Sequence, residues 1–188
     1  MHELIPPEAV LGALKKALAS TLGVNESAIQ PSSSIVRDLG AESLDFLDIN
    51  YQMEQLFGIR MARHFFLEHA EEMFGEGSAI DDDGHLTVPA MALLRERYGG
   101  AGLPPTGESL DLDEVPALIT VQAVVDTILA ILETLPEHCT CGSPAWRVED
   151  GTRIVCGSCG EVALFTSGDE LTKQWLASAG PGAGLGQP

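Results

Sequence analysis

The sequence predicts a mainly α-helical protein with a small β module near its C-terminal end. Two observations favour this fold class. Apolar residues recur at three- and four-residue steps in three long windows, at 7–22, 43–57 and 115–135, which is typical of amphipathic helices. All four cysteines lie beyond residue 136, on either side of a short alternating segment that predicts a β-hairpin. The 188 residues correspond to about one or two domains.

The protein is strongly acidic, with 28 Asp and Glu residues, 10 Lys and Arg residues and a formal net charge of −18. Such a charge repels phosphate backbones, which argues against nucleic acid and anionic membranes as partners. Of this charge, −15 falls on residues 1–136 and −3 on the rest. The charge therefore divides the chain into an acidic first module and a cysteine-containing second one.

The first residues lack the basic start and apolar run of a secretory signal, so we expect a protein kept in the cytoplasm. In that reducing compartment, cysteines are more often metal ligands or free thiols than disulfides. The most apolar window, 115–135, is interrupted by Pro116, Gln122 and Asp126 before it reaches the length of a membrane span. We therefore expect a core helix there, capped by Thr120, and no membrane span.

The window 7–22 predicts a first helix, and Gly23 ends it before an ordered loop at 24–39. The window 43–57 predicts a second helix that begins at Ser43. It carries two apolar stripes on opposite sides. One contains Phe46, Ile49, Met53, Leu56 and Phe57, and the other contains Leu44, Leu47 and Tyr51. Periodicity alone leaves open whether the second stripe is exposed or buried.

The segment 60–113 predicts helices at 63–74 and 89–98, a short extended piece at 85–88 and a loop at 99–108. Asp81, Asp82 and Asp83 lack the alternate spacing of a calcium loop, so we interpret them as a solvated turn. Residues 179–188 are mostly Gly, Ala and Pro, and we expect them to be disordered.

The string Asp38-Leu-Gly-Ala-Glu-Ser-Leu-Asp-Phe-Leu-Asp48 resembles the prosthetic-group attachment region of the acyl carrier proteins. The resemblance covers residues 8–57 and resumes at 115–132, where Ile119-Thr-Val-Gln-Ala-Val-Val-Asp is similar to the last helix of that family. It implies a four-helix bundle and a non-enzymatic carrier. It also implies that Ser43 is esterified by 4′-phosphopantetheine, whose thiol holds acyl groups as thioesters.

By the same resemblance, the helix at 44–57 is the recognition helix for partner enzymes. The expected partners are a phosphopantetheinyl transferase and acyl-processing enzymes with basic surfaces, in fatty-acid or polyketide-like biosynthesis. The expected docking residues are the three residues of the second stripe and the acidic residues around it and Ser43: Glu42, Leu44, Asp45, Leu47, Asp48, Tyr51 and Glu54. Two features depart from the family: Glu42 replaces the usual Asp before the serine, and the insertion at 60–113 replaces a short third helix.

The cysteines Cys139, Cys141, Cys156 and Cys159 have the outline of a zinc ribbon, in which two tight turns present thiolates to a tetrahedral ion. The first pair is one residue closer than usual, so His138 is an alternative ligand to Cys139. We prefer four thiolates, the commonest set in closed structural sites. Because a closed site has no open position, we expect structural rather than catalytic Zn²⁺.

These observations predict an acyl-carrier-like domain at 1–136 with an insertion at about 60–113, a zinc-ribbon-like module at 137–178 and a disordered tail at 179–188. Two alternatives remain open. One is an unmodified carrier-fold adaptor that docks through its zinc ribbon, and the other is a carrier of aminoacyl or peptidyl groups. We do not expect an enzyme, because no nucleophile and base can be placed together from the sequence.

Overall fold

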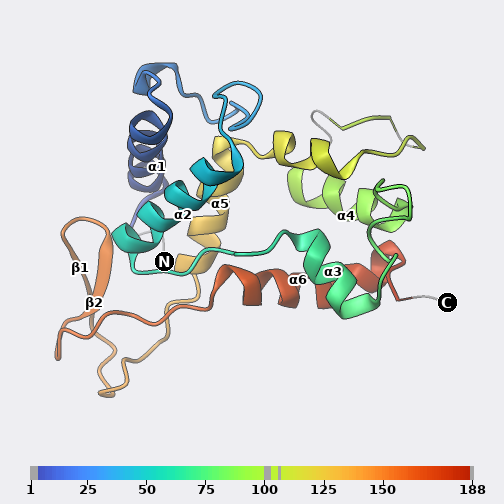
Figure 1. Cartoon of the computed structure of the whole chain (residues 1–188). Coiled ribbons are helices and arrows are strands. Elements are labelled where there is room, and N and C mark those ends of the chain that lie inside the picture. The colour runs from blue at the N-terminus through green and yellow to red at the C-terminus, as the bar shows by residue number, and fades with distance from the viewer. Residues whose placement is uncertain (1–3, 100–102, 106, 187–188) are drawn as a thin grey trace. The chain divides into compact units, whose positions relative to one another are not determined.

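The computed structural model of the chain describes residues 4–99, 103–105 and 107–186, which are mainly helical with a small antiparallel sheet, as predicted (Figure 1). The chain divides into two compact units. The first joins the residues up to Met61 to Thr120–Gly168, and the second joins Ala62–Ile119 to the residues from Asp169 onward. Each unit is therefore made of two separate stretches of sequence.

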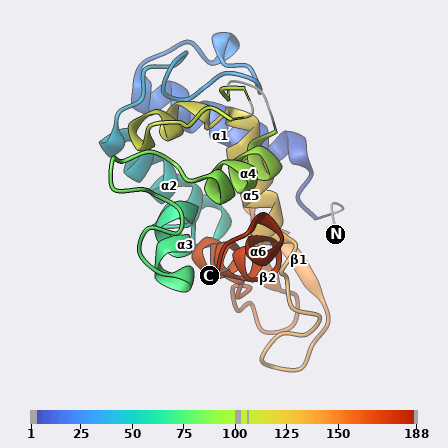
Figure 2. The same cartoon turned by 90° about the vertical axis from the view of Figure 1, so that its right-hand side faces the viewer.

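The first unit is built on the helices α1 (Pro7–Leu22), α2 (Ser43–Phe57) and α5 (Val121–Leu132). These helices lie side by side in both views (Figures 1 and 2). Their facing apolar stripes form the core, which contains Val10, Leu14, Leu18, Ile49, Met53, Phe57, Val125, Ile128 and Ile131. The loop between α1 and α2 includes the short 3₁₀ helix η1 (Glu26–Ala28), and buried Ile29 and Ile35 anchor that loop to the core.

Helix α5 begins later than the apolar window predicts. The window from residue 115 first forms the 3₁₀ helix η2 (Leu112–Leu118), which contains Pro116. The α-helix starts only after Thr120, whose hydroxyl accepts a hydrogen bond from the backbone N–H of Ala123 at 3.1 Å. A serine or threonine cap of this kind fixes a helix start, so the predicted capping role of Thr120 is confirmed and also explains the break.

The predicted hairpin is present as strands β1 (Trp146–Glu149) and β2 (Arg153–Cys156), which pair antiparallel with Trp146 opposite Cys156. Because Glu149 pairs with Arg153, three residues, Asp150, Gly151 and Thr152, connect the strands. The φ angles of Asp150 and Gly151 are 51° and 82°, and the backbone N–H of Thr152 donates to the carbonyl of Glu149 at 3.3 Å. The length and conformation of this loop fix the register in which the strands present their side chains.

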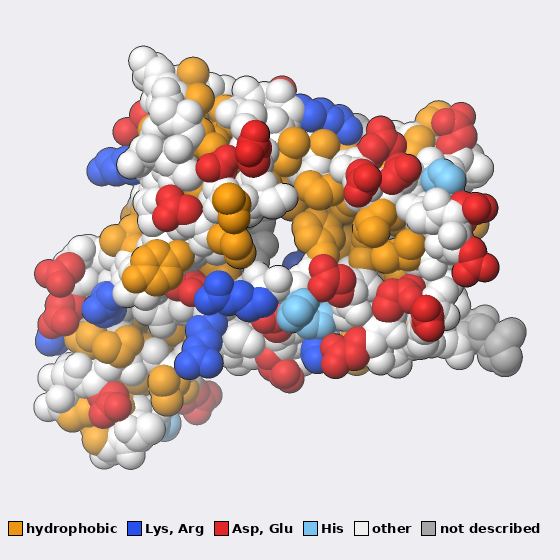
Figure 3. All heavy atoms as spheres, viewed as in Figure 1, with side chains coloured by type: hydrophobic (Ala, Val, Ile, Leu, Met, Phe, Trp, Pro, Cys, Tyr) orange, Lys and Arg blue, Asp and Glu red, His pale blue; other side chains and the backbone are white. Residues whose placement is uncertain are grey.

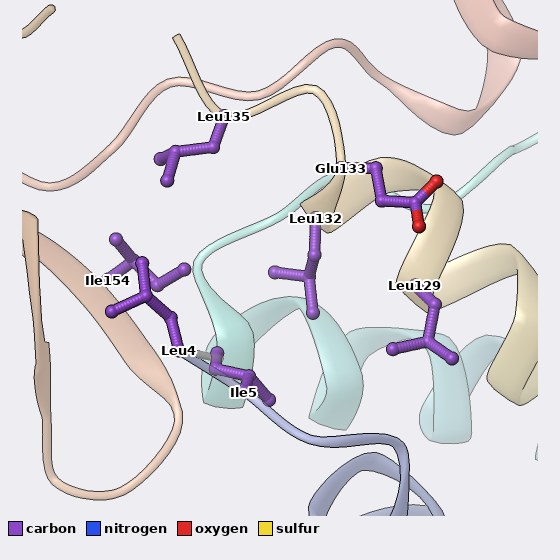
Figure 4. A pocket seen from close by; sticks show the side chains of 7 residues that line it. All are labelled: Leu4, Ile5, Leu129, Leu132, Glu133, Leu135 and Ile154. Carbon is purple, nitrogen blue, oxygen red and sulfur yellow. The ribbon is translucent and has the colours of Figure 1, made fainter. Parts of the chain in front are cut away.

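The hairpin packs against the helical bundle within the first unit. Figure 4 shows a pocket that Ile154 of β2 lines together with Leu4 and Ile5 of the N-terminal segment, Leu129 and Leu132 of α5, and Leu135 beyond the end of α5. Ile154 is buried in this contact. Whereas the sequence predicts a separate module at 137–178, the structure groups residues 137–168 with the bundle in the first unit and the residues from Asp169 onward with the second.

The second unit contains α3 (Phe66–Phe74), α4 (Val88–Tyr98), η2 and α6 (Gly168–Ala183). Its own apolar core draws on all four elements and includes Phe66, Leu67, Ala70, Ala90, Leu93, Leu94, Val115, Leu118, Leu176 and Leu185. The helices predicted at 63–74 and 89–98 are present with shifted starts. Thr87 caps α4 by accepting a hydrogen bond from the backbone N–H of Ala90 at 3.3 Å.

Helix α6 corrects the prediction of a disordered tail. It continues to Ala183, and Leu185 beyond it is buried, while residues 187 and 188 lie outside the described residues. Disorder was expected because residues 179–188 are mostly small, but in this helix the small residues permit close packing. A Cβ atom on Gly180 would come within 2.7 Å of the Phe74 ring, so the glycine lets the helix approach α3.

Asp169 fastens the start of α6 to the beginning of the second unit. Its carboxylate accepts hydrogen bonds from the backbone N–H groups of Arg63 and His64, at 3.0 and 3.2 Å, and contacts His69 Nε2 at 2.9 Å. Burial alone would raise the pKa of Asp169. The hydrogen bonds to His69, Arg63 and His64 outweigh burial and hold the pKa below its usual value.

Candidate functional site

The start of α2 is capped without the Ser43 side chain. Glu42 is the N-cap residue, and its backbone N–H donates to Asp45 Oδ2 at 2.8 Å while its own carboxylate accepts from the backbone of Asp45. This reciprocal arrangement is a capping box. Ser43 is the first residue of the helix and is exposed. Within the part of the chain that the structure describes, its hydroxyl has no hydrogen-bond partner.

The Ser43 hydroxyl is therefore accessible to another protein and is not activated by a neighbouring base. A catalytic serine needs such a base, whereas a serine that only receives a group does not. The helix N-terminus also favours an anion attached at this point, because its backbone N–H groups carry partial positive charge. The residues present thus fit a phosphodiester on Ser43, although Glu42 and Asp45 add negative charge beside it.

The two apolar stripes of α2 have different environments. Ile49, Met53 and Phe57 are buried in the bundle core. Leu44, Leu47 and Tyr51 are 77%, 56% and 57% exposed, and we call these three residues the docking strip. Figure 3 shows hydrophobic side chains over α2 with acidic ones around them. A helix buried on both sides is excluded, and Leu56, which the periodicity grouped with the core, is partly exposed.

The acidic residues of α2 fall into two groups. Glu42 and Asp48 are exposed and Asp45 is half-buried; Asp48 also accepts a hydrogen bond from the Thr21 hydroxyl at 2.7 Å. Glu54 is buried, and its carboxylate accepts a hydrogen bond from the backbone N–H of Met61 at 2.9 Å. Its expected place among the docking residues is therefore wrong, because the side chain turns inward to hold the chain that follows α2.

The four cysteines converge as predicted. Cys139 Sγ lies 3.7 Å from Cys159 Sγ, Cys141 Sγ lies 3.6 Å from Cys156 Sγ, and all four sulfur atoms lie within 4.8 Å of one another. Four thiolates at about 2.3 Å from one zinc ion are about 3.8 Å apart. The cluster therefore fits a tetrahedral metal ion. His138 is exposed and does not belong to the cluster found among the described residues.

Tight turns hold the cysteines in place. In the first turn, the backbone N–H of Gly142 donates to the carbonyl of Cys139, and in the second, the N–H of Gly160 donates to the carbonyl of Cys156. Backbone N–H groups of Cys159 and Ser158 also point at Cys156 Sγ and lower the pKa of that thiol to about 6. These N–H groups favour at Cys156 the thiolate form that a metal ion requires. The pKa of Cys159 is instead raised to about 12: a backbone hydrogen bond from Glu161 lowers it, but the neighbouring thiols Cys141, Cys139 and Cys156, together with burial, outweigh that hydrogen bond.

Sequence reasoning missed two residues that reach α2 from the hairpin. The Thr152 hydroxyl donates to the backbone carbonyl of Leu56 at 2.9 Å, and Arg153 Nη2 donates to that of Gln55. No sequence pattern links residues so far apart along the chain. The sequence offered an indirect signal: α2 has no basic residue in its own last turn, so a cation that caps this helix end has to come from another element.

The match to known proteins falls on this same region. A family model described as "Phosphopantetheine attachment site" matches residues 12–71. The acyl carrier protein of Rubrobacter xylanophilus is 32% identical over 74 residues, which are 39% of this chain and 86% of that protein. No solved structure matches the chain.

The fold and the site thus define a carrier domain of the phosphopantetheine-attachment class. The chain belongs to the acyl carrier protein family. Members of this class are modified by a phosphopantetheinyl transferase, interact with acyl-processing enzymes and are not themselves catalytic. The alignment with the Rubrobacter protein leaves most of this chain uncovered. Within the described residues, no helix is both long enough and apolar enough to cross a membrane.

Proposed function

We propose that this protein carries acyl groups as thioesters on a 4′-phosphopantetheine arm attached to Ser43, in fatty-acid or polyketide-like biosynthesis. In the loading step, the Ser43 hydroxyl attacks the phosphorus of coenzyme A that bears the pantetheine arm, loses its proton and releases 3′,5′-ADP. The arm then supplies the thiol that holds the acyl group. The role of this chain is to present the serine and to dock with its partners.

The observation that carries the proposal is the capping of α2 by Glu42 and Asp45. A serine before an apolar helix most often serves as the cap itself, and here that task is already taken. Ser43 is left exposed inside the segment that matches the attachment-site family. A serine that is neither a cap nor a nucleophile beside a base is well suited to accept a group from another enzyme.

Intact-mass measurement tests the attachment. The purified chain is incubated with coenzyme A and a broad-specificity phosphopantetheinyl transferase. We expect a mass increase of one 4′-phosphopantetheine group for the wild-type chain and none for Ser43→Ala. Ser27→Ala is a suitable control, because Ser27 is exposed but lies in η1 rather than in α2. The absence of any mass increase would favour the unmodified adaptor.

We further propose that the docking strip, together with Glu42, Asp45 and Asp48, meets a basic surface on partner enzymes. Opposite charges would speed the encounter and make it sensitive to salt. Leu47→Ala is expected to raise KM for the transferase about tenfold without changing stability. Leu164→Ala, which removes another exposed leucine of the first unit, is the matched control. Equal kinetics for the two variants would contradict the proposal.

We also propose that Cys139, Cys141, Cys156 and Cys159 bind one structural Zn²⁺ ion. The thiolate geometry supports this assignment, and a reducing cytoplasm would keep the thiols available. Metal analysis of the purified chain should give one equivalent of zinc, which is lost in Cys156→Ser and retained in His138→Ala. Fractionation of cells that express the untagged chain tests the cytoplasmic location.

An aminoacyl or peptidyl carrier remains the alternative within the class. The loaded chain, once it carries the arm, can be offered malonyl or acyl donors and, separately, amino-acid-activating enzymes. Acyl loading without aminoacyl loading is the expected result.

A further inference from the structure

The C-terminal end of α2 is completed by residues from outside the helix. The last carbonyls of an α-helix have no partner within the helix and need one from elsewhere. The carbonyl of Glu54 accepts the backbone N–H of Gly58 at 2.9 Å, and those of Gln55 and Leu56 accept Arg153 and Thr152. Since α2 has no basic residue in its last turn, the cation at this negative end of the helix dipole comes from β2.

Besides these hydrogen bonds, the hairpin approaches the end of α2 closely. A Cβ atom on Gly58 would lie 3.2 Å from Val162 Cγ1 and 3.8 Å from Arg153. Val162 itself forms a bridge with Val155 of β2. The chain therefore leaves α2 through a glycine in the left-handed conformation, directly against the hairpin. Both the end of the helix and the first residue after it are in contact with the cysteine-bearing segment.

The cysteine cluster lies on the same strand as these capping residues. Cys156 is the last residue of β2, which begins at Arg153. Cys156 also receives the backbone hydrogen bond of Gly160, and its N–H donates to Glu161. A metal ion bound by Cys156 and the other three cysteines would thus fix the strand from which the Arg153 and Thr152 side chains extend.

We propose that Thr152 and Arg153 are positioning residues that hold the C-terminal half of α2, and that metal binding by the four cysteines keeps them in place. The zinc module then serves the carrier itself rather than a foreign partner. Because Leu47 and Tyr51 lie on α2, the order of this helix end controls how the docking strip is presented. This consequence for docking rests on the proposed function, whereas the consequence for helix order does not.

Native-state hydrogen exchange of the full-length, zinc-loaded chain tests the proposal. Thr152→Val removes the hydroxyl but keeps the shape of the side chain, and Arg153→Gln removes the cation. We expect both variants to retain one equivalent of zinc and to exchange the amides of residues 55–58 about three to ten times faster. Arg147→Gln is the matched control, because Arg147 lies in β1 and pairs with Glu149 instead of with α2.

The kinetics of modification by the transferase provide a second test of the proposal. Thr152→Val and Arg153→Gln are expected to raise KM for the carrier about three- to tenfold with kcat unchanged, because Ser43 itself is untouched. Thr152→Ser restores the hydroxyl and should restore both KM and amide protection. Removal of the metal by a chelator should accelerate exchange at residues 55–58 at least as much as either substitution.

Three results would overturn the proposal. Exchange at residues 55–58 could match the Arg147→Gln control in both variants. Thr152→Ser could behave like Thr152→Val, which would show that the hydroxyl is irrelevant. The chelator could remove zinc and leave α2 protection unchanged. If the wild-type chain gains no mass with coenzyme A, the proposed function fails, but the exchange measurement still decides whether the hairpin holds α2.

Discussion

The two ends of α2 are stabilised in different ways. At the N-terminal end, Glu42 and Asp45 are three residues apart and cap the helix by themselves. At the C-terminal end, Thr152 and Arg153 reach the helix from a hairpin that lies almost a hundred residues further along the chain. The end that carries the candidate attachment serine is thus locally determined, and the opposite end depends on tertiary structure.

Because of this difference, the accessibility of Ser43 does not depend on the contacts that stabilise the other end of α2. A locally capped N-terminus can leave Ser43 open on all sides, because nothing distant has to cover it in order to hold the helix. The C-terminal end is contacted by the hairpin, and the residues proposed to meet partners, Leu44, Leu47 and Tyr51, all precede the carbonyls that the hairpin contacts. The four predictions that follow test this division, from the largest expected effect to the smallest.

Loss of the proposed metal ion should have the largest effect on stability. A small hairpin with little core of its own would depend on such an ion for its folding free energy. We expect Cys156→Ser to lower the free energy of unfolding of the first unit by more than about 3 kcal/mol in chemical denaturation. Ser158→Ala, in the same turn, should change it by less than about 0.5 kcal/mol. Equal stability of the two variants would show that the cysteines do not stabilise the unit.

Removal of the buried Glu54 carboxylate at the C-terminal end of α2 should have the next-largest effect on stability. Glu54→Ala leaves the backbone N–H of Met61 without its acceptor, which costs about 1–3 kcal/mol. Glu54→Gln keeps an acceptor oxygen and should cost less. Thermal unfolding of the three proteins checks this order. A stable Glu54→Ala variant that binds partners poorly would instead restore Glu54 to the docking surface.

Disruption of the capping box at the N-terminal end of α2 should cost less stability than Cys156→Ser or Glu54→Ala. Asp45→Ala removes the acceptor for the Glu42 backbone N–H, for which we expect about 1 kcal/mol of destabilisation. Asp45→Asn keeps an acceptor and should retain most of the stability. Denaturation curves with the same slope and shifted midpoints would support the prediction, and wild-type stability of Asp45→Ala would refute it.

Substitution of Ser43, the proposed attachment serine, should have the smallest effect on stability. Ser43 is exposed and its side chain caps nothing, so Ser43→Ala should change the free energy of unfolding by less than about 0.5 kcal/mol. The same variant is expected to lose all modification by the transferase. A loss of about 1 kcal/mol or more would mean that the hydroxyl serves as a cap after all.

The sequence predicted those features that depend on neighbouring residues. Helical spacing located α1 and α2, the Asp150-Gly151 pair located the hairpin turn, and cysteine spacing indicated the sulfur cluster. The string around Ser43 identified the family that the comparisons also found. Each of these signals lies within a few residues of the feature that it predicts.

The features that were missed depend on residues brought together only by folding. Glu54 has the spacing of an exposed acid, and only the path of the chain at Met61 shows that it turns inward. Gly180 and its neighbours have the composition of a disordered tail, and only the folded structure shows that Gly180 lies against the Phe74 ring. Exposure of the docking strip could not be decided from periodicity, because a two-striped helix fits burial on both sides equally well.

The interleaved order of the two units has a consequence for truncation. The second unit begins at Ala62, but its core includes Leu176 and Leu185. The first unit takes no residue beyond Gly168. Truncation after Gly168 would therefore keep all residues of the unit that carries Ser43, but it would take Leu176 and Leu185 out of the core of the second unit and expose the apolar residues that pack against them.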